Sequence, residues 1–273
     1  MSESIKIIEE GESFIRFEVS DVTPAYANML RRTLLNDIPK LAISKVNFHH
    51  GEIRQGEDKV YSSLTSLFDE VIASRLGMVP LPTDLKMNER DSCTCGGVGC
   101  SLCTVNYSLF VVGPKKVMSG DLVAIGDPKM APTDKEIPIV ELNERQAIML
   151  DAEAYMGRAR EHARFQATSG VSYRYGRELK VSAREPDLDD IIKHSPKNIL
   201  RKNDKEVVFT TDYPSKYISK LYRMDSLEEK EDDKRFIFYF ETDGSLKPRD
   251  VLDYALSRIK ERLSGIVEKV PGE

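Results

Sequence analysis

The sequence predicts an α+β fold in which both ends of the chain form one domain of sheet and helices, and the middle forms an inserted, mostly β domain. Two observations lead to this prediction. A strand and an amphipathic helix follow one another near each end of the chain, and the middle contains short strands separated by irregular loops. The length of 273 residues agrees with one large domain or two small ones.

The N-terminal part predicts a strand and then a helix. Apolar and charged residues alternate in Ser13–Val19, which is typical of a strand. Thr23 can cap the following helix, and Pro24 suits its first turn because no backbone N–H is needed there. Pro39 is expected to end this helix, and Leu41–Phe48 to form the next strand. One apolar stripe along the helix is formed by Ala27, Leu30, Leu34 and Ile38.

The next segments predict a second helix and a third strand. Leu64–Leu76 carries an apolar residue every fourth position, which favours a helix. Gly77 is expected to end it in a left-handed conformation, and Pro80 prevents its continuation. A polar loop that contains all the cysteines follows, and Val105–Val111 then alternates as a strand.

The middle of the chain contains shorter and less regular signals. Residues 119–140 predict loops with brief strands, because glycine, proline and aspartate recur at short intervals. Glu161–Ala183 predicts two or three strands, broken near Gly170 and Gly176. Asp187–His194 predicts a short helix.

The last part of the chain returns to clear patterns. Residues 228–234 are charged and predict a solvated loop, whereas Phe236–Phe240 is apolar on both faces and predicts a buried strand. Asp243 and Gly244 are expected to form a turn. Pro248 opens a helix of about twenty residues, which needs a surface to cover. Its apolar stripe consists of Leu252, Leu256, Ile259, Leu263 and Val267.

Composition limits the classes of function. The chain has 40 basic and 45 acidic residues, a net charge of −5, which argues against a protein that wraps nucleic acid by itself. No apolar run approaches the roughly 18 residues of a membrane span, and acidic residues occupy the N-terminus where a signal peptide is basic. We expect a soluble, cytoplasmic protein without a membrane partner.

The four cysteines predict a metal site. Cys93, Cys95, Cys100 and Cys103 have the spacing C-x-C-x4-C-x2-C, with glycines that let the loop turn tightly. Four thiolates suit one structural Zn²⁺, because no coordination position stays open for catalysis. An iron–sulfur cluster is the alternative, although the spacing differs from the common ferredoxin pattern, and unliganded thiols are a further one.

The remaining candidate sites are explained more simply. His50 and Glu52, followed by the last cysteine pair, superficially match a zinc deaminase signature, but Gly99 stands where that signature has proline. Acidic pairs such as Asp69 with Glu70 are explained as helix caps or exposed faces. The sequence contains no phosphate-binding loop, dinucleotide fingerprint or nucleophile elbow.

Four segments together resemble the family of the D-type subunits of archaeal RNA polymerase, which is related to the third-largest eukaryotic subunit and the bacterial alpha amino-terminal domain. They occur in the family's order and span nearly the whole chain. The four segments are Ala27–Leu35 followed by Pro39, Phe68–Leu81, Gly157–Gln166 and Phe240–Leu246.

The resemblance implies a discontinuous dimerisation domain formed by residues 1–45 and 226–273. It implies an inserted domain with the zinc-binding loop at 46–183 and a small insertion at 184–225. Some members carry iron–sulfur clusters in such an insertion, but residues 184–225 contain no cysteine here, so we expect none.

The resemblance also implies the function and the partners. The chain is expected to be a non-catalytic assembly subunit of a nucleotidyltransferase, DNA-directed RNA polymerase, and to meet DNA only through the assembled enzyme. Subunit L is the expected dimer partner, followed by subunits N and P and the large catalytic subunits. A stand-alone zinc hydrolase or deaminase and an iron–sulfur electron carrier are the alternatives.

Two groups of residues are expected at these contacts. If the partner buried all seven apolar residues of the two helices, the gain would be about 10–20 kcal/mol before ordering costs. Arg158, His162 and Arg164 are expected to contact a large subunit, as are the two arginines of the first helix. The expected interface residues are Leu30, Arg31, Arg32, Leu34, Ile38, Leu252, Leu256, Ile259 and Leu263.

Overall fold

The computed structural model describes residues 4–55, 59–182, 199–202, 206–211 and 227–268. The chain divides into two compact units. Unit 1 comprises Met1–Arg31 and Gly170–Phe240, and unit 2 comprises Arg32–Ser169 and Glu241–Glu273. The domain boundaries expected from the sequence stay a prediction, and the helix expected at Asp187–His194 lies outside the described residues.

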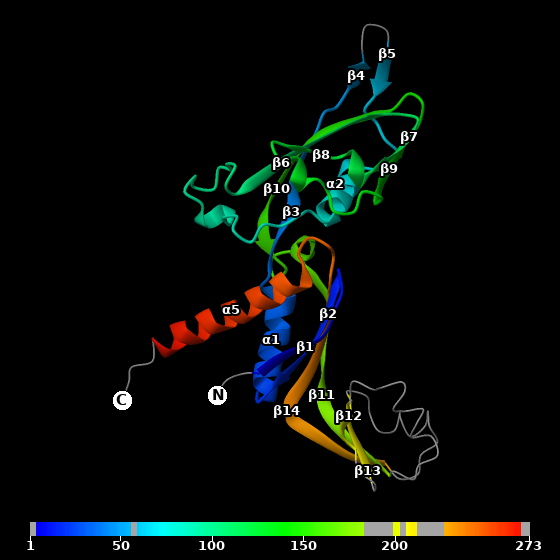
Figure 1. Cartoon of the computed structure of the whole chain (residues 1–273). Helices are drawn as coiled ribbons and strands as arrows, with labels where there is room; N and C mark the ends of the chain where they lie inside the picture. The colour runs from blue at the N-terminus through cyan, green and yellow to red at the C-terminus, as the bar shows by residue number, and fades with distance from the viewer. Residues whose placement is uncertain (1–3, 56–58, 183–198, 203–205, 212–226, 269–273) are drawn as a thin grey trace. The chain divides into compact units, whose positions relative to one another are not determined.

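Unit 1 is built on a six-stranded sheet with the order β1-β2-β14-β11-β13-β12 (Figure 1). Strand β2 pairs with β14, so segments more than 200 residues apart in the sequence are neighbours in one sheet. The strands are β1 (Ser4–Glu10), β2 (Phe14–Ser20), β11 (Thr168–Ser182), β12 (Ile199–Lys202), β13 (Glu206–Thr211) and β14 (Leu227–Thr242).

Aromatic residues of β2 and β14 form much of the core of unit 1. The ring of Phe17 stacks on that of Phe238, with centroids 5.1 Å apart, and Tyr173 packs edge-on against Phe236 at 5.5 Å. Phe236, Phe238 and Phe240 are fully buried. The strand predicted at Phe236–Phe240 and its burial are therefore confirmed.

Helix α1 (Pro24–Asn36) forms where the sequence predicts it. The Oγ1 atom of Thr23 accepts a hydrogen bond from the backbone N–H of Tyr26 at 3.3 Å, so the predicted cap is present. The helix ends at Asn36, before Pro39, which begins strand β3 (Pro39–Phe48) instead.

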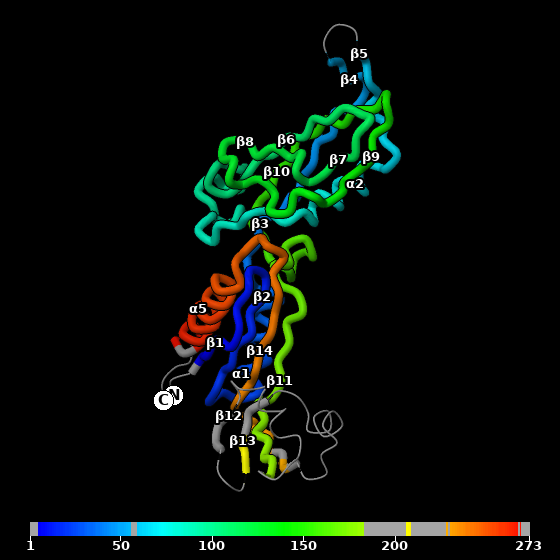
Figure 2. Tube along the Cα trace, turned by 45° about the vertical axis from the view of Figure 1, so that its right-hand side comes forward, coloured from blue at the N-terminus to red at the C-terminus, as the bar shows by residue number. Residues whose placement is uncertain are grey.

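Unit 2 contains a four-stranded antiparallel sheet with the order β3-β10-β6-β8. Two antiparallel two-stranded sheets, β4 with β5 and β7 with β9, accompany it, and Figure 2 shows the β4–β5 pair extending away from the four-stranded sheet. The strands predicted at Val105–Val111 and within 119–140 are confirmed. The remaining elements before α5 are β4 (Glu52–Gln55), β5 (Lys59–Ser62), β6 (Thr104–Val112), β7 (Lys115–Met118), β8 (Val123–Ile125), β9 (Pro138–Leu142), β10 (Ala147–Arg158), and the 3₁₀ turns η1 (Arg90–Ser92), η2 (Ser119–Asp121), η3 (Pro128–Met130) and η4 (Ala163–Phe165).

Strand β10 is an interior strand of this sheet, and the sequence analysis did not predict it. It pairs with β3 on one side and with β6 on the other. Its inner face is buried at Leu150, Ala152 and Ala154, and its outer face carries Asp151 and Glu153. The alternation was present in the sequence, but alanines made it weak, because they carry little apolar surface.

The second predicted helix begins later than expected. Helix α2 spans Asp69–Met78, and the residue before it, Phe68, has an extended backbone. Leu64 and Phe68 are 75% and 80% exposed, so their spacing matched the buried stripe only by coincidence. Two acidic residues in the first turn favour a start at Asp69.

Gly77 does not end α2 in a left-handed conformation, so that prediction was wrong. It lies inside the helix and is buried. A Cβ atom at this position would lie 3.3 Å from the carbonyl oxygen of Ile43 in β3. The glycine therefore allows the close approach of α2 to β3, and the helix ends at Met78, with Val79 as its C-cap before Pro80.

Two predictions near the long strands are also corrected. Glu161–Ala183 does not form several broken strands, because β11 runs through Gly170 and Gly176 without interruption. Gly176 makes room for the side chain of Arg235, whose Nε atom would lie 2.6 Å from a Cβ there. The side chains described within 228–234 are exposed or half-buried, as expected, but the segment belongs to β14, since exposed strand faces accept charged residues.

The C-terminal turn and helix are confirmed. Gly244 has a φ of 89°, and the backbone N–H of Ser245 donates to Oδ1 of Asp243 at 3.1 Å. Helix α5 then spans Pro248–Val267. None of the helices in the described part of the chain is long and apolar enough to span a membrane.

Candidate functional site

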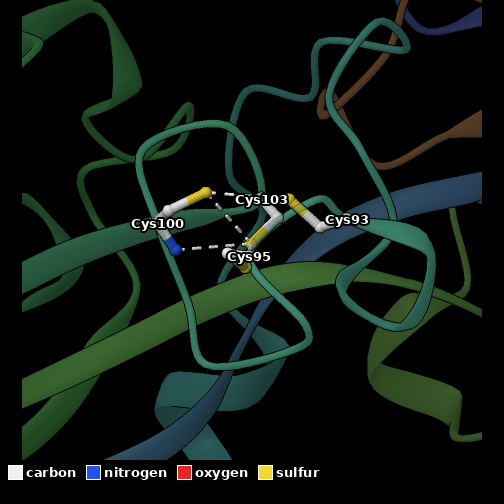
Figure 3. Close-up of side chains that lie close together, drawn as sticks. All are labelled: Cys93, Cys95, Cys100 and Cys103. Atoms are coloured by element: carbon white, nitrogen blue, oxygen red, sulfur yellow. Dashed lines mark hydrogen bonds between the residues drawn. The ribbon is translucent and has the colours of Figure 1, made fainter.

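The four cysteines converge in the loop between η1 and β6, as the sequence predicts. Their Sγ atoms all lie within 4.8 Å of one another, and the side chains point toward a common centre (Figure 3). The Sγ–Sγ distances are 3.6 Å from Cys93 to Cys100, 3.7 Å from Cys95 to Cys103 and 3.9 Å from Cys100 to Cys103.

These distances fit a tetrahedral metal ion. With Zn–S bonds of about 2.3 Å, the sulfurs of a regular tetrahedron lie about 3.8 Å apart. The thiols are free rather than joined as disulfides. Four soft thiolates around one centre would occupy every coordination position of a tetrahedral ion. Such a cluster suits a structural metal, because no position is left for a reacting water.

Backbone amides shift the pKa values of the thiols. The amide of Cys95 lowers the pKa of Cys93, and the amide of Gly99 lowers the pKa of Cys95 to about 6. The amide of Leu102 also lowers the pKa of Cys100, but burial and the other thiols together raise it to about 11. The backbone amides thus favour the thiolate forms of Cys93 and Cys95, and a bound cation would favour deprotonation of all four thiols.

The deaminase-like pattern is not assembled. Nε2 of His50 lies 3.2 Å from Oδ2 of Asp69, and Glu52 lies in strand β4. Neither residue belongs to the cysteine cluster, whose ligand atoms come from cysteines alone. Glu153 forms ion pairs with Lys45 and Arg90 at 3.1 and 3.4 Å.

Most of the apolar residues expected at the partner interface are buried within this chain. Leu256 is partly accessible and Leu263 is 44% exposed, so only these two keep surface for a partner. The estimate of 10–20 kcal/mol must be corrected, since two such side chains contribute at most about 3–6 kcal/mol. The five buried residues are Leu30, Leu34, Ile38, Leu252 and Ile259.

The C-terminal part of α5 has little cover from the chain. Ile259 is the last buried residue among the described side chains of this helix. Beyond it, Leu263 and Ile266 are 44% and 59% exposed. Sequence reasoning missed Ile266, although its place one turn after Leu263 was the available signal.

The arginines have different surroundings. Arg158 is buried, and its guanidinium donates to the backbone oxygen of Asp37, to the hydroxyl of Tyr254 and to the carboxylate of Glu89. Its side chain is therefore committed within unit 2, and we no longer expect it to contact a large subunit. Arg31 binds Oδ1 of Asn28 at 2.9 Å on an accessible helix face, and Arg32 is exposed.

His162 and Arg164 lie together at η4. Nδ1 of His162 accepts a hydrogen bond from the backbone N–H of Arg164 at 3.1 Å. Arg164 also donates from Nη1 to the carbonyl oxygen of Ile43 at 3.1 Å. Both residues line a groove of about 320 Å³ beside α2, where His162 is exposed.

The sheet-rich fold, the four converging cysteines and the exposed end of α5 are typical of a structural protein whose thiol cluster could hold a metal ion. A comparison with known families makes this specific, because the model described as "RNA polymerase Rpb3/Rpb11 dimerisation domain" matches residues 16–263. The chain belongs to this family, and its resemblance to archaeal polymerase subunits is confirmed at that level.

Relatives match nearly the whole length of the chain. It is 51% identical to the DNA-directed RNA polymerase subunit Rpo3 of Thermoplasma volcanium, over 97% of this chain and 98% of the relative. It is 50% identical to the protein of the same name in Picrophilus torridus, over 97% and 99% of the two chains. It is 32% identical to that of Archaeoglobus fulgidus, over 99% and 100%.

Proposed function

We propose that this chain is a non-catalytic assembly subunit of DNA-directed RNA polymerase. The observation that carries the proposal is the match of the dimerisation family model to residues 16–263, together with relatives named as polymerase subunits at 51% identity over nearly full length. The assembled enzyme transfers nucleotides in the cytoplasm, and we expect this chain to supply none of the reacting groups and to approach DNA only within the complex.

We propose that the chain first forms a heterodimer with the small subunit L. Residues 1–45 and 226–273 would form the dimerisation domain, which carries 46–183 as the inserted domain with the cysteine loop and 184–225 as a small insertion. Subunits N and P would join next, and the platform would then recruit the large catalytic subunits.

The accessible part of α5 is the proposed contact with the small subunit. Leu256, Leu263 and Ile266 offer apolar surface on a helix whose end has no buried residue after Ile259 among its described side chains. The five buried apolar residues named above would act indirectly, because their packing fixes the helices that present this surface. A larger contact area than these three side chains is needed for a stable dimer.

We propose one structural Zn²⁺ at Cys93, Cys95, Cys100 and Cys103. The Sγ distances and the all-thiolate ligand set support zinc, which is stable with four cysteines and needs no redox partner. When bound, zinc would hold the loop closed and supply no reactive water. An iron–sulfur cluster predicts visible colour, so metal analysis and an absorbance spectrum distinguish the two.

Arg31, Arg32, His162 and Arg164 are the proposed contacts with a large subunit. Arg32 and His162 are exposed, and Arg31 lies on the same helix face as Asn28. Arginine on a rigid helix suits bidentate binding to carboxylates. Replacing Arg31 and Arg32 by alanine should spare the heterodimer but weaken recruitment of a large subunit, and unaltered assembly would refute this role.

Reconstitution of the polymerase from its separate subunits tests the proposed function. Omitting this chain should prevent the large subunits from forming an active enzyme, and adding it back should restore transcription. Active enzyme without the chain would contradict the proposal. Turnover by the isolated chain would instead favour a hydrolase or deaminase, and reversible redox activity would favour an electron carrier.

A further inference from the structure

The loop that joins the two cysteine pairs is wrapped around the side chain of Arg90. Nε of Arg90 donates to the carbonyl oxygen of Gly97 at 2.9 Å, and Nη2 donates to the carbonyl oxygen of Val98 at 2.9 Å. One guanidinium therefore binds two successive carbonyl groups between Cys95 and Cys100. Its planar fork of donors suits such a pair of acceptors.

Arg90 is itself fixed to strand β10. Nη1 and Nη2 each lie 3.4 Å from Oε2 of Glu153, and the guanidinium carbon lies 5.2 Å from the centre of the Tyr155 ring. The side chain is only 23% exposed, so these contacts are partly shielded from water. Arg90 thus connects the cysteine loop to the central strand of the sheet.

Glycines make room for this arrangement. Gly99 has a φ of 103°, and a Cβ atom there would lie 3.1 Å from Nη2 of Arg90. Glycine is therefore required at position 99 both by the backbone conformation and by the nearby guanidinium. Gly97, whose carbonyl Arg90 binds, also has a left-handed φ of 82°.

We propose that Arg90 is a positioning residue for the metal ion. It holds residues 97–99 in the turn that brings Cys95 and Cys100 onto one centre. An ion that enters a loop already shaped in this way does not have to order it, so binding is tighter. This inference rests on the proposed metal site and goes beyond it by naming the residue that shapes the loop.

Loss of an outer partner of a metal site typically lowers metal affinity about 10- to 100-fold, and we expect a loss of this size for Arg90→Ala. Arg90→Lys keeps the positive charge but cannot bind two carbonyls with one planar group. If positioning is the role, the lysine variant should bind nearly as weakly as the alanine variant. If only the charge matters, the lysine variant should bind like the wild type.

The test uses the full chain and Co²⁺ as the probe, because Co²⁺ bound by thiolates absorbs visible light. Co²⁺ titration followed by Zn²⁺ competition gives the affinity, and metal release to a chelator gives the dissociation rate. Arg54→Ala is the matched control, since Arg54 is 72% exposed and pairs with Glu52 in the β4–β5 hairpin. We expect the control to match the wild type, and both Arg90 variants to bind about 10- to 100-fold more weakly with an unchanged four-thiolate spectrum.

Three results would overturn the proposal, and they differ from one another. Equal affinity of Arg90→Ala and wild type would exclude a positioning role while leaving the metal site intact. Full rescue by Arg90→Lys would assign the effect to charge. A wild type that binds neither Co²⁺ nor Zn²⁺ would refute the metal site itself, and the positioning role with it.

A second variant covers the case in which Arg90→Ala does not fold. Glu153→Gln keeps the shape of the side chain and weakens the anchor of Arg90 on β10, while the hydrogen bonds to the loop carbonyls stay. We expect several-fold weaker Co²⁺ binding than in the wild type, and unchanged affinity would contradict the anchoring. Thermal unfolding of the metal-free proteins separates this effect from a general loss of stability.

Discussion

Ile259 and Leu263 are one helical turn apart on α5. Truncating Ile259 should mainly lower the stability of the chain, whereas truncating Leu263 should mainly weaken binding to the partner. Ile259 is 2% exposed and belongs to the core of the chain, whereas Leu263 is 44% exposed. Ile259→Ala should lower the free energy of unfolding of the isolated chain by about 2–4 kcal/mol, because it leaves a cavity. Leu263→Ala should lower that free energy less, by at most about 1.7 kcal/mol, because 44% of its surface is already exposed in the isolated chain.

Binding to the small subunit should be affected at Leu263. A fully buried leucine contributes about 1.5–3 kcal/mol, so covering the exposed 44% of Leu263 contributes about 0.7–1.3 kcal/mol. This corresponds to about a three- to ninefold increase in Kd for Leu263→Ala. Leu263→Asp should weaken binding further, because a carboxylate would have to leave water.

The two quantities are measured separately. Urea unfolding of the isolated chain gives its stability, and isothermal titration with the small subunit gives Kd. The reasoning fails if Leu263→Ala destabilises the isolated chain as much as Ile259→Ala does, or if Leu263→Asp leaves Kd unchanged.

Three further predictions concern stability and the metal. Gly77→Ala should lower the free energy of unfolding in urea by about 1 kcal/mol, because the contact with the Ile43 carbonyl outweighs the gain in helix propensity. Gly265→Ala should instead raise it by about 0.5–1 kcal/mol, because a Cβ atom there would have nothing within 4 Å. A gain in stability at both positions would refute the close contact at Gly77. Burial raises the pKa of Asp121, but Lys115 and the Met118 amide outweigh it and hold that pKa below its usual value. The carboxylate therefore stabilises the fold above the unfolded pKa of about 3.9. Asp121→Asn should lower the free energy of unfolding by up to about 1 kcal/mol at pH 7, because Lys115 is 49% exposed and water screens the ion pair, and by progressively less as the pH falls below about 4. A difference that does not depend on pH would exclude this ion pair as the cause. Removal of the metal with a chelator should lower the melting temperature and expose residues 93–103 to proteolysis, and identical digestion with and without metal would show that the ion does not hold the loop.

The cysteine loop and the starts of α1 and α5 could be predicted because their signals are local. Four cysteines gathered within Cys93–Cys103 are typical of a metal-binding loop. The cap at Thr23 and the proline in the first turn at Pro248 depend only on adjacent backbone groups. Strand Phe236–Phe240 was equally clear, because a continuous apolar run has to be buried on both sides.

The errors arose where distant parts of the chain decide the outcome. Glycine is needed at position 77 because a carbonyl of β3 lies close to it, and at position 176 because the side chain of Arg235 does. Leu64 repeats the apolar spacing of α2 but is exposed, since the pattern does not show where the neighbouring elements lie. These relations are set by tertiary packing, which a single sequence does not display.

The interface shows the same limitation. Amphipathic spacing correctly indicated that Leu30, Leu34 and Ile259 are buried. It could not distinguish burial by the chain itself from burial by a partner, because both require an apolar face. Arg158 is a similar case, since a basic residue in a basic segment was expected at the surface and is instead surrounded by acceptors from its own unit.

The mass of the complex between this chain and the small polymerase subunit tests the central claim most directly. Light scattering on a gel-filtered equimolar mixture should give the summed mass of one copy of each chain, and Leu263→Asp should shift the mixture toward separate chains. If the two wild-type proteins elute as separate species at micromolar concentration, the chain is not a dimerising assembly subunit.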